Sequence, residues 1–454
     1  MPGKLTLPLV ERPLDDPFAV YRGETVTVGR FLGDAAALSE ILPADGFVLN
    51  LARDRYHFQV AFAAAILRGA CTLLPPNDTI GAQRAVSAGC GSPRVLHDGA
   101  DVAEGLVGLD LRQLPPAADW SGAIPDIDAD TVVSISFTSG STGSATEIAR
   151  RWRTHFEGVA LNAATYLGRL GGAFGMVATV PPQHMYGMEV TMMAPLRLPV
   201  TVSATRPLFP ADVAEALATV PSPRVLVSTP LHLEALLDST VRFPAVTRVI
   251  TATAPLDAGL ARRVEERLGA ELIDVYGCSE TGCLATRRLA RDEAWTAIPG
   301  FSFDTGQDGV TRVSAAHLPE PVALQDRLRL DADGILHLEG RASDLVNVGG
   351  KRGSLANLTA LLKSAPGVMD GAVFQPRDRR GGRLAGVYAG SAEPGDVRAF
   401  LREHLDPVLV PRPLVRVASL PRNETGKLPL DALERLLTEH VANTVRHRTA
   451  AHDR

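Results

Sequence analysis

Between about residue 46 and residue 285, short apolar runs rich in β-branched residues alternate with stretches of helical length, and this alternation constrains the fold more than any other feature. It is the pattern of βαβ units in a doubly wound, mostly parallel sheet, whose ligands collect at the carboxyl ends of the strands. The predicted buried strands are 47–51, 132–137, 175–180, 224–228, 247–251 and 271–275. The predicted helices are 56–68, 154–167, 210–220, 231–237 and 257–268.

A second unit is predicted toward the C-terminus. From Gly300 to Arg341 the helical signal disappears, and 309–315, 327–330 and 335–339 indicate a small antiparallel β section with a turn at Asp333-Gly334. Beyond it, helices are predicted over 355–363 and 397–405 and strands over 371–375 and 384–389. We therefore predict an α/β chain with a large domain over 1–341, a small mobile α+β domain over 342–440 and a disordered tail over 441–454.

Composition excludes several classes of protein. Of the 454 residues, 45% are hydrophobic and 21% charged, which is typical of a globular protein. No apolar run reaches the roughly 18 residues of a membrane span, and the start has no signal-peptide core, so we expect a cytoplasmic protein. A net charge of −5 with no basic stripe argues against a nucleic-acid partner. The four cysteines form no C-x-x-C pair, which predicts free thiols.

A strand that runs directly into a loop of small residues is the first chemical signal. Residues 132–143 read VVSISFTSGSTG. Glycines allow close approach of the backbone, and hydroxyl groups bond phosphate oxygens. The phosphate-binding candidates are Thr138, Ser139, Gly140, Ser141, Thr142 and Gly143. A P-loop is excluded because no lysine follows in GSTGSATE, whereas a plain Ser/Gly surface turn stays open for the loop taken alone.

Lysine is scarce in this chain. It occurs only at Lys4, Lys351, Lys363 and Lys427, so 42 of the 46 basic residues are arginine. Because a compact ammonium on a flexible stem differs chemically from a planar guanidinium, each lysine is a candidate for a specific role.

Further motifs give the chain a resemblance, over nearly its full length, to the acyl-adenylate-forming superfamily of acyl-CoA synthetases, adenylation domains and luciferases. VYGCSET at 275–281 resembles the family's Y-G-x-[ST]-E-T motif, and LQD at 324–326 stands where the family has T-G-D. GRASDLVNVGGKR at 340–352 resembles its hinge segment, and LPRNETGK at 420–427 resembles its C-terminal lysine loop. The resemblance implies ATP as substrate, Mg²⁺, a small carboxylic acid, and a phosphopantetheine thiol of CoA or an acyl carrier protein as acceptor.

The resemblance assigns roles around the nucleotide. Tyr276 would stack on adenine, Gly277 would lie in the same ATP-binding site, Ser279 would bond the α-phosphate, and Glu280 would help to hold Mg²⁺. Asp326 would accept the ribose hydroxyls, while Arg341 and Arg352 would lie near the sugar and the phosphates.

Lys427 is the residue expected to act on the transition state. Joining a carboxylate to a phosphate brings two anions together, and a mobile cation stabilises the charge that builds up between them. Ser343 and Asp344 resemble the hinge about which the family turns its small domain. Gly349, Gly350 and Lys351 resemble the segment near the thiol tunnel, although a surface role for Lys351 stays open.

The acid pocket is expected from two segments. PQHMYG at 182–187 resembles P-x-x-H-x-x-G, one residue short, and His184 either gates this pocket or satisfies a core hydrogen bond. ITATAPL at 250–256 stands where relatives show G-G-A-P-L, and replacing the paired glycines narrows the space, which fits a compact acid. The predicted lining is His184, Met185, Tyr186, Gly187, Ala252, Ala254 and Cys278.

The chain also departs from the family pattern. Ala145 and Thr146 replace the usual Pro-Lys after the loop, so we expect Arg150, Arg151 or Arg153 to supply the charge from a helix that follows the loop. The short chain and the 150–153 stretch are similar to compact ligases that load hydroxybenzoate-type acids onto carrier proteins in aryl-polyene and xanthomonadin-type pathways.

Three functions follow from these motifs. The first is an ATP-dependent acid–thiol ligase that forms acyl-AMP. The second is a homologue that binds nucleotide without turnover, suggested by Thr146 and Ser343. The third is an α/β hydrolase with a nucleophile elbow at Gly277-Cys278-Ser279, although G-x-S-x-G requires glycine where Thr281 stands.

Overall fold

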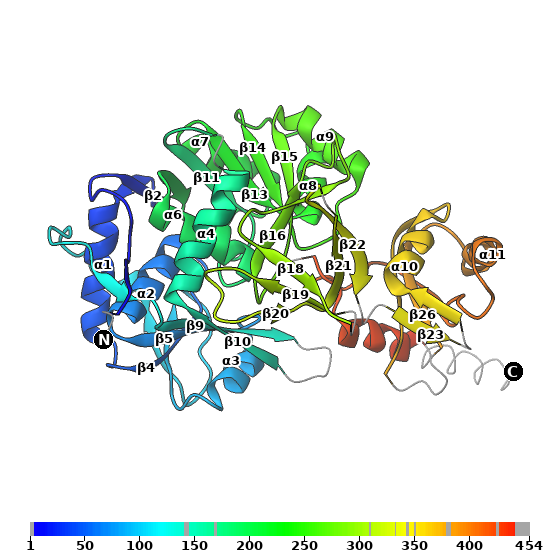
Figure 1. Cartoon of the computed structure of the whole chain (residues 1–454), viewed down its shortest axis with the longest axis horizontal. Helices are drawn as coiled ribbons and strands as arrows, with labels where there is room; N and C mark the ends of the chain where they lie inside the picture. The colour runs from blue at the N-terminus through cyan, green and yellow to red at the C-terminus, as the bar shows by residue number, and fades with distance from the viewer. Residues whose placement is uncertain are drawn as a thin grey trace, which may run out of the picture. The chain divides into compact units, whose positions relative to one another are not determined.

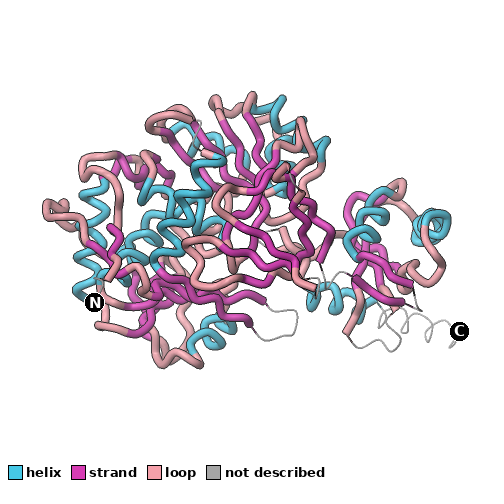
Figure 2. Tube along the Cα trace, in the orientation of Figure 1, coloured by secondary structure: helices cyan, strands magenta, loops and turns pink. Residues whose placement is uncertain are grey.

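The computed structural model describes residues 4–139, 145–167, 170–307, 310–331, 333–341, 345–348, 351–377, 383–423 and 426–440. The chain divides into two compact units. The first comprises Met1–Ser302, Val313–Val322 and Ala332–Leu336, and the second comprises Phe303–Arg312, Ala323–Asp331 and His337–Arg454. The helices and strands are shown in Figures 1 and 2.

A six-stranded sheet forms one layer of the first unit, with the strand order β10-β9-β5-β4-β6-β7. All neighbouring strands are parallel except β9 and β10, which are antiparallel. The strands are β4 (Gly46–Asn50), β5 (Ala70–Leu74), β6 (Arg94–His97), β7 (Val107–Asp110), β9 (Val132–Ser139) and β10 (Ala145–Arg151). The helices of this region are α1 (Val28–Ile41), α2 (Arg55–Leu67) and α3 (Ile80–Ser87), with a 3₁₀ turn at Leu111–Gln113.

A larger sheet of eleven strands has the order β21-β22-β17-β16-β15-β14-β13-β11-β12-β2-β3. Its central strands from β15 to β2 are parallel, and the pairs β15–β16, β16–β17, β17–β22 and β2–β3 are antiparallel. The strands are β2 (Pro17–Tyr21), β3 (Glu24–Thr27), β11 (Phe174–Ala178), β12 (Val200–Ser203), β13 (Arg224–Ser228), β14 (Arg248–Thr251), β15 (Glu271–Cys278), β16 (Gly282–Arg287), β17 (Trp295–Ala297), β21 (Asp326–Leu330) and β22 (Ile335–Arg341). The helices between them are α4 (Trp152–Tyr166), α5 (Met185–Gly187), the π-helical η2 (Met188–Met193), α6 (Ala194–Arg197), α7 (Pro210–Thr219), α8 (Pro230–Leu237) and α9 (Ala258–Leu268).

The remaining elements form small sheets. β1 (Thr6–Pro8) pairs with β8 (Asp126–Asp128), and β18 (Ser302–Thr305), β19 (Thr311–Ser314) and β20 (Val322–Ala323) form a three-stranded sheet. In the C-terminal part, β23 (Leu345–Val348) pairs with β24 (Lys351–Ser354), and β25 (Val368–Phe374), β26 (Ala385–Gly390) and β27 (Leu414–Val417) form a sheet. Helices α10 (Leu355–Ser364) and α11 (Pro394–His404) accompany them, and 430–440 is helical.

The hydrophobic core surrounds α2, whose sequence from Val60 to Leu67 is apolar throughout. Twelve of its thirteen residues, from Arg55 to Ile66, are buried. The same core cluster contains Val48 of β4, Val133 of β9, Phe156 of α4 and Met176 of β11, so α2 is covered by elements of both sheets. A helix enclosed in this way needs no polar face. Asp54 begins α2 by accepting the backbone N–H groups of Tyr56 and His57.

The predicted fold class is confirmed, and the predicted strands and helices agree with the structure to within three residues. The error concerns the segment after the phosphate-loop candidate. We expected a helix to carry Arg150, whereas Ala145–Arg151 form strand β10, antiparallel to β9, and α4 begins only at Trp152. In the described part of the chain, no helix combines the length and apolarity that a bilayer crossing requires.

Candidate functional site

The carboxyl ends of four parallel strands of the larger sheet bring most candidate residues of the first unit to one edge. The strands β11, β13, β14 and β15 are neighbours, and their registers align Ala178 with Val227 and Thr251 with Asp274. The 182–187 segment follows β11, Ala252 and Ala254 follow β14, and Tyr276 to Glu280 lie at the end of β15. Sequence motifs about 90 residues apart therefore meet at one sheet edge, as expected for a ligand site in such a fold.

The phosphate-loop candidate joins β9 to β10. Thr138 and Ser139 are the last residues of β9, and they lie opposite Thr146 and Ala145. Gly140, Ser141, Thr142 and Gly143 fall outside the described residues. The loop candidate is thus the segment that connects the antiparallel strands β9 and β10.

Arg150 connects this hairpin to the VYGCSET motif. Its Nη2 atom donates a hydrogen bond to the carbonyl oxygen of Ser279 at 2.6 Å. The residue is 4% exposed, and burial lowers the pKa of its guanidinium, opposed by the charges of Glu189 and Glu280. Two motifs that lie about 130 residues apart are therefore in direct contact.

The other two arginines considered for the same role point elsewhere. Arg151 and Arg153 form ion pairs with Asp130 at 2.9 and 3.7 Å. Asp130 is exposed, so these pairs lie at the surface. Among the described residues, Arg150 is the one of the three that bonds the VYGCSET turn.

The VYGCSET motif forms the turn between β15 and β16. Tyr276 and Ser279 are half-buried, as is Glu280, and the Tyr276 ring meets Trp295 edge-on at 5.9 Å. A Cβ added to Gly277 would lie 2.2 Å from the carbonyl oxygen of Gly282, so this hairpin closes only with glycine. Cys278 Sγ lies 3.1 Å from Thr281 Oγ1, and burial raises the pKa of the Cys278 thiol to about 11. At neutral pH that thiol is protonated and is a poor nucleophile.

This turn also overturns the hydrolase hypothesis. A nucleophile elbow places its serine between a strand and a helix. Here Ser279 lies between two antiparallel strands, with β16 beginning at Gly282.

The predicted acid-pocket segment packs over the ends of β13 and β14. The Tyr186 hydroxyl donates to the carbonyl oxygen of Ile250 at 2.8 Å and lies 3.3 Å from that of Ser228. A Cβ on Gly187 would lie 2.1 Å from the carbonyl oxygen of Pro181, which explains the glycine. His184 is half-buried at the N-terminal end of α5, as is Met185 in its first turn. The structure thus brings His184, Met185, Tyr186 and Gly187 to the same edge as Ala252 and Cys278.

The segment after β14 has a glycine-like backbone conformation, although Ala252 and Thr253 stand where the family motif has two glycines. Thr253 has a φ of +80°, whereas Ala252 is buried beside it. A β-branched residue in this region is strained, so the conformation is imposed by its surroundings. Ala254 is half-buried in the same segment.

The candidates of the second unit lie on strands and loops of that unit. Asp326 begins β21 and is half-buried, and Arg341 ends β22. Lys351 and Arg352 lie on β24, opposite Val348 and Asn347. Ser343, Asp344, Gly349 and Gly350 lie outside the described residues.

Lys427 is exposed on a short, internally bonded loop. Its backbone N–H donates to Asn423 Oδ1 at 2.9 Å, and the Asn423 N–H donates to the Lys427 carbonyl at 2.8 Å. Gly426 supplies the left-handed step with a φ of +77°. The backbone of the loop that carries Lys427 therefore has a defined conformation within its unit.

Glu189 is a buried charged residue that the motifs did not indicate. It lies in η2, is 8% exposed, and accepts hydrogen bonds from Asn162 and from the Cys283 backbone. In the sequence, Glu189 can be noticed as the single carboxylate in the apolar run MEVTMMAPL. A charge buried in such a run requires hydrogen-bond partners.

The carboxylates of the candidate site fit a magnesium ion whose remaining ligands are water and substrate phosphates. Across the residues that the structure describes, no group of three or more His, Cys, Asp or Glu side chains could hold a metal by itself. Mg²⁺ commonly takes one or two carboxylates and completes its shell with water and substrate phosphates. Glu280, a single half-buried carboxylate of the VYGCSET turn, is compatible with that arrangement.

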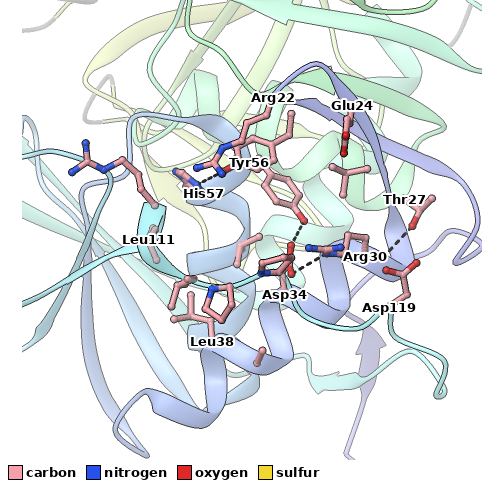
Figure 3. A pocket seen from close by; sticks show the side chains of 18 of the residues that line it. Arg22, Glu24, Thr27, Arg30, Asp34, Leu38, Tyr56, His57, Leu111 and Asp119 are labelled. Carbon is pink, nitrogen blue, oxygen red and sulfur yellow. Dashed lines mark hydrogen bonds and ion pairs between the residues drawn. The ribbon is translucent and has the colours of Figure 1, made fainter.

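A cavity of about 550 Å³ lies elsewhere in the first unit, between the β2–β3 hairpin, α1, the start of α2 and the segment after β7 (Figure 3). Several polar groups of its wall already bond one another. The Tyr56 hydroxyl donates to Asp34 at 2.8 Å, Arg30 pairs with Asp34 at 3.0 Å, and the Tyr21 hydroxyl lies 2.7 Å from His57 Nε2. None of the motif residues lines it, so this cavity is not the candidate active site.

A family model described as "AMP-binding enzyme" matches residues 10–305. Among curated proteins, 4-coumarate–CoA ligase of Rhodobacter capsulatus is 31% identical over 304 residues, which cover 66% of this chain and 75% of the relative. The 3,4-dihydroxybenzoate–[aryl-carrier protein] ligase of Bacillus anthracis is 23% identical, covering 66% of this chain and 73% of the relative.

Solved structures show the same fold over nearly the whole chain. ATP-bound MatB from Rhodopseudomonas palustris superposes with a TM-score of 0.77 at 20% identity, covering 93% of this chain and 97% of that one. The AMP complex of o-succinylbenzoate CoA synthetase from Bacillus subtilis superposes with a TM-score of 0.76 at 18% identity, covering 91% and 94%. At these identities the likeness concerns the fold alone.

Proposed function

Because the chain belongs to the family of AMP-binding enzymes, we propose that it activates a small aromatic carboxylic acid with ATP and passes the acyl group to a phosphopantetheine thiol. A carboxylate oxygen of the acid attacks the α-phosphorus of ATP, the bond to the bridging oxygen breaks, and pyrophosphate leaves. The thiol sulfur then attacks the acyl carbon, AMP leaves with the carboxylate oxygen, and the thiol proton is released.

The contact between Arg150 and the carbonyl oxygen of Ser279, at 2.6 Å, carries this proposal. It joins the strand that follows the phosphate-loop candidate to the turn that holds Ser279 and Glu280. In the proposed reaction, Ser279 donates to the α-phosphate and Tyr276 stacks on the base. Such preorganised donors stabilise the charge that develops at the phosphorus.

The second unit contributes the remaining roles in this proposal. Asp326 and Arg341 bind the ribose, Arg352 lies near the phosphates, and the Lys427 ammonium neutralises the two anions as they join. Mg²⁺, held by Glu280 and the substrate phosphates, supplies charge neutralisation when bound. Ser343 and Asp344 form the proposed hinge, and Gly349, Gly350 and Lys351 form the proposed thiol tunnel.

Two observations support an aromatic acid. The relatives include ligases named for 4-coumarate, 3,4-dihydroxybenzoate and 4-chlorobenzoate. In this chain Ala252 is buried and Thr253 keeps its backbone conformation where the family motif has glycines, which leaves a compact space. A flat ring fits such a space better than a long flexible chain.

The acceptor thiol belongs either to CoA or to a carrier protein. Relatives of both kinds match over similar lengths, with 66% of this chain covered in each case. CoA is the acceptor named for the relative of higher identity. Loading of a carrier protein, as in the compact hydroxybenzoate ligases, is the second candidate.

A release assay tests the function directly. Purified protein is given ATP, Mg²⁺ and each of a panel of benzoic, cinnamic and short aliphatic acids, with CoA or holo carrier protein in parallel. We expect pyrophosphate release that depends on an aromatic acid. If no acid in the panel supports ATP–pyrophosphate exchange, a binding-only function replaces the ligase.

A further inference from the structure

The carboxylate of Glu189 is bonded on several sides although the residue is buried. Asn162 Nδ2 donates to Oε1 at 2.7 Å, the Tyr166 hydroxyl donates to Oε1 at 3.2 Å, and the Cys283 backbone N–H donates to Oε2 at 3.1 Å. Burial raises the pKa of Glu189, and these three bonds together with the charge of Arg150 oppose that rise. Three donors aimed at one buried carboxylate form a built site for that group.

The bond to Cys283 reaches the base of the VYGCSET turn. Gly282, the residue before Cys283, has a φ of +79°, and a Cβ there would lie 2.4 Å from Glu189 Oε2. The carboxylate therefore occupies the place that a side chain at position 282 would take. The backbone of this turn and the Glu189 carboxylate are fitted to each other.

Arg150 holds the other end of the same turn. It donates to the Ser279 carbonyl at 2.6 Å, and Glu189 is the first of the charges that stabilise its guanidinium, with Glu280 a further one. Arg150 and Glu189 are both buried, at 4% and 8% exposure, and they carry opposite charges. A pair of this kind interacts more strongly than one in water.

We propose that Glu189 and Arg150 are positioning residues that fix the Ser279–Gly282 turn between them and so aim the Ser279 and Glu280 side chains at the nucleotide. Glu189 bonds the backbone where the turn ends, and Arg150 bonds it where the turn begins. The catalytic consequence rests on the proposed function, because it assumes that Ser279 and Glu280 bind phosphate and Mg²⁺. The structural consequence, an ordered turn in the free protein, does not.

The structural part is tested by amide hydrogen exchange on the peptide covering 277–285 in the protein without ligand. Glu189→Gln places an amide where three donors converge, and Arg150→Met removes the donor to Ser279 with little loss of volume. We expect both variants to exchange faster in this peptide, by about 10-fold or more. Unchanged exchange in both variants would overturn the positioning role.

The catalytic part is tested by acid-dependent ATP–pyrophosphate exchange over a range of Mg²⁺ concentrations. We expect Glu189→Gln and Arg150→Met to lower kcat by about 10- to 100-fold and to raise the Mg²⁺ concentration at half-maximal rate, because a displaced turn misplaces Glu280. Arg150→Lys keeps the charge and should recover part of the rate. A fall in thermal stability without any change in kcat or Mg²⁺ dependence would reduce the two residues to a structural role.

Two further variants separate the explanations. Glu271→Gln removes a carboxylate that pairs with Arg248 at 2.6 Å at the start of β15, far along the strand from the turn, and its Mg²⁺ dependence should equal that of wild type. The double variant Glu189→Gln/Asn162→Asp swaps the positions of the carboxylate and the amide. It should restore part of the rate of ATP–pyrophosphate exchange. Failure of wild type to exchange pyrophosphate would refute the proposed function, whereas the hydrogen-exchange result would still decide the positioning role.

Discussion

Arg422 forms a bidentate ion pair with Asp370, with Nη2 and Nε lying 2.7 to 3.0 Å from the two carboxylate oxygens. The same guanidinium donates through Nη1 to the carbonyl oxygen of Gly426 at 2.7 Å. Arg422 thereby ties the loop that carries Lys427 to strand β25. The backbone of the loop that carries this scarce lysine is therefore held by an arginine, whose planar fork suits a carboxylate better than lysine does.

Replacing Lys427 with alanine should abolish adenylation while leaving ATP affinity nearly intact. The ammonium is proposed to act where the carboxylate and the α-phosphate join, so its loss falls on the transition state. We expect kcat for pyrophosphate exchange to fall by at least about 100-fold. ATP affinity is measured by calorimetry on the same preparations. An equal loss of ATP binding would show that the role of Lys427 is misassigned.

Replacing Arg422 with lysine should lower the exchange rate less than Lys427→Ala does. Lysine cannot make both the bidentate pair and the bond to Gly426, so the loop loses its fixed geometry but keeps its ammonium. We expect a loss of about 10-fold in kcat. An unchanged rate would mean that loop geometry does not limit the reaction.

Gly282→Ala should destabilise the protein by about 2 to 4 kcal/mol, because alanine is strained in the left-handed region and must displace a buried carboxylate. Its Cβ would lie 2.4 Å from Glu189 Oε2. The free energy of unfolding in urea measures the change. Gly81→Ala in α3 is the matched control, since a Cβ there meets no atom within 4 Å, and it should be neutral or slightly stabilising. Equal effects of the two substitutions would contradict the steric argument.

The sequence predicted the parallel strands well because they are buried on both faces and read as continuous apolar runs, as 224–228 does for β13. It failed at 145–151, where we predicted no strand and expected a helix after the loop to present Arg150. Burial alternates along β10 from Glu147 to Arg151, but the polar composition of ATEIARR and its lack of aromatic residues hide this period. The antiparallel partner β9 decides its structure, and that pairing is not a local property.

For the candidate site, the sequence indicated the segments but not their internal supports. It placed Ser279 and Glu280 in a motif, yet Glu189 lies about 90 residues away, and only the fold brings it under Gly282. It likewise left Arg150, Arg151 and Arg153 equivalent. The directions of Arg150 and Arg151 depend on the pleat of β10 and on a break in register between them, and Arg153 lies in the first turn of α4, none of which the sequence pattern reveals.

His317 should make the protein less stable as the pH falls through the weakly acidic range. It is 2% exposed, and its ring nitrogens have no hydrogen-bond partner in the described parts of the chain. Burial, followed by the charges of Arg150 and Arg153, lowers its pKa to about 4. An unfolded histidine titrates near about 6.5, so between these values the unfolded state binds a proton that the native state does not.

The contribution of buried, neutral His317 to the free energy of unfolding is thus fully present above about pH 6.5 and is lost as the pH falls to about 4. Its full size is about 3 kcal/mol. His317→Leu removes the titrating group and leaves no buried ring nitrogen. We expect urea unfolding of this variant to show a smaller loss of stability than wild type between pH 6.5 and pH 4. Parallel pH profiles would show that His317 does not titrate in this way.

Thr253→Gly should stabilise the protein slightly and admit bulkier acids. Thr253 has a φ of +80°, and glycine adopts this conformation without strain, although it loses more conformational freedom on folding. The net gain should be no more than about 1 kcal/mol. Removing the side chain beside Ala252 enlarges the proposed acid pocket, so kcat/KM should rise for ring-substituted benzoic acids relative to benzoic acid itself.

Asp45→Gly is the matched control, because Asp45 also has a positive φ, of 54°, but lies in an exposed turn before β4. It should change stability by a similar amount and leave the relative rates for the acids unchanged. If Thr253→Gly alters stability alone, this segment does not line the acid pocket, and the proposed preference for a compact acid loses its structural support.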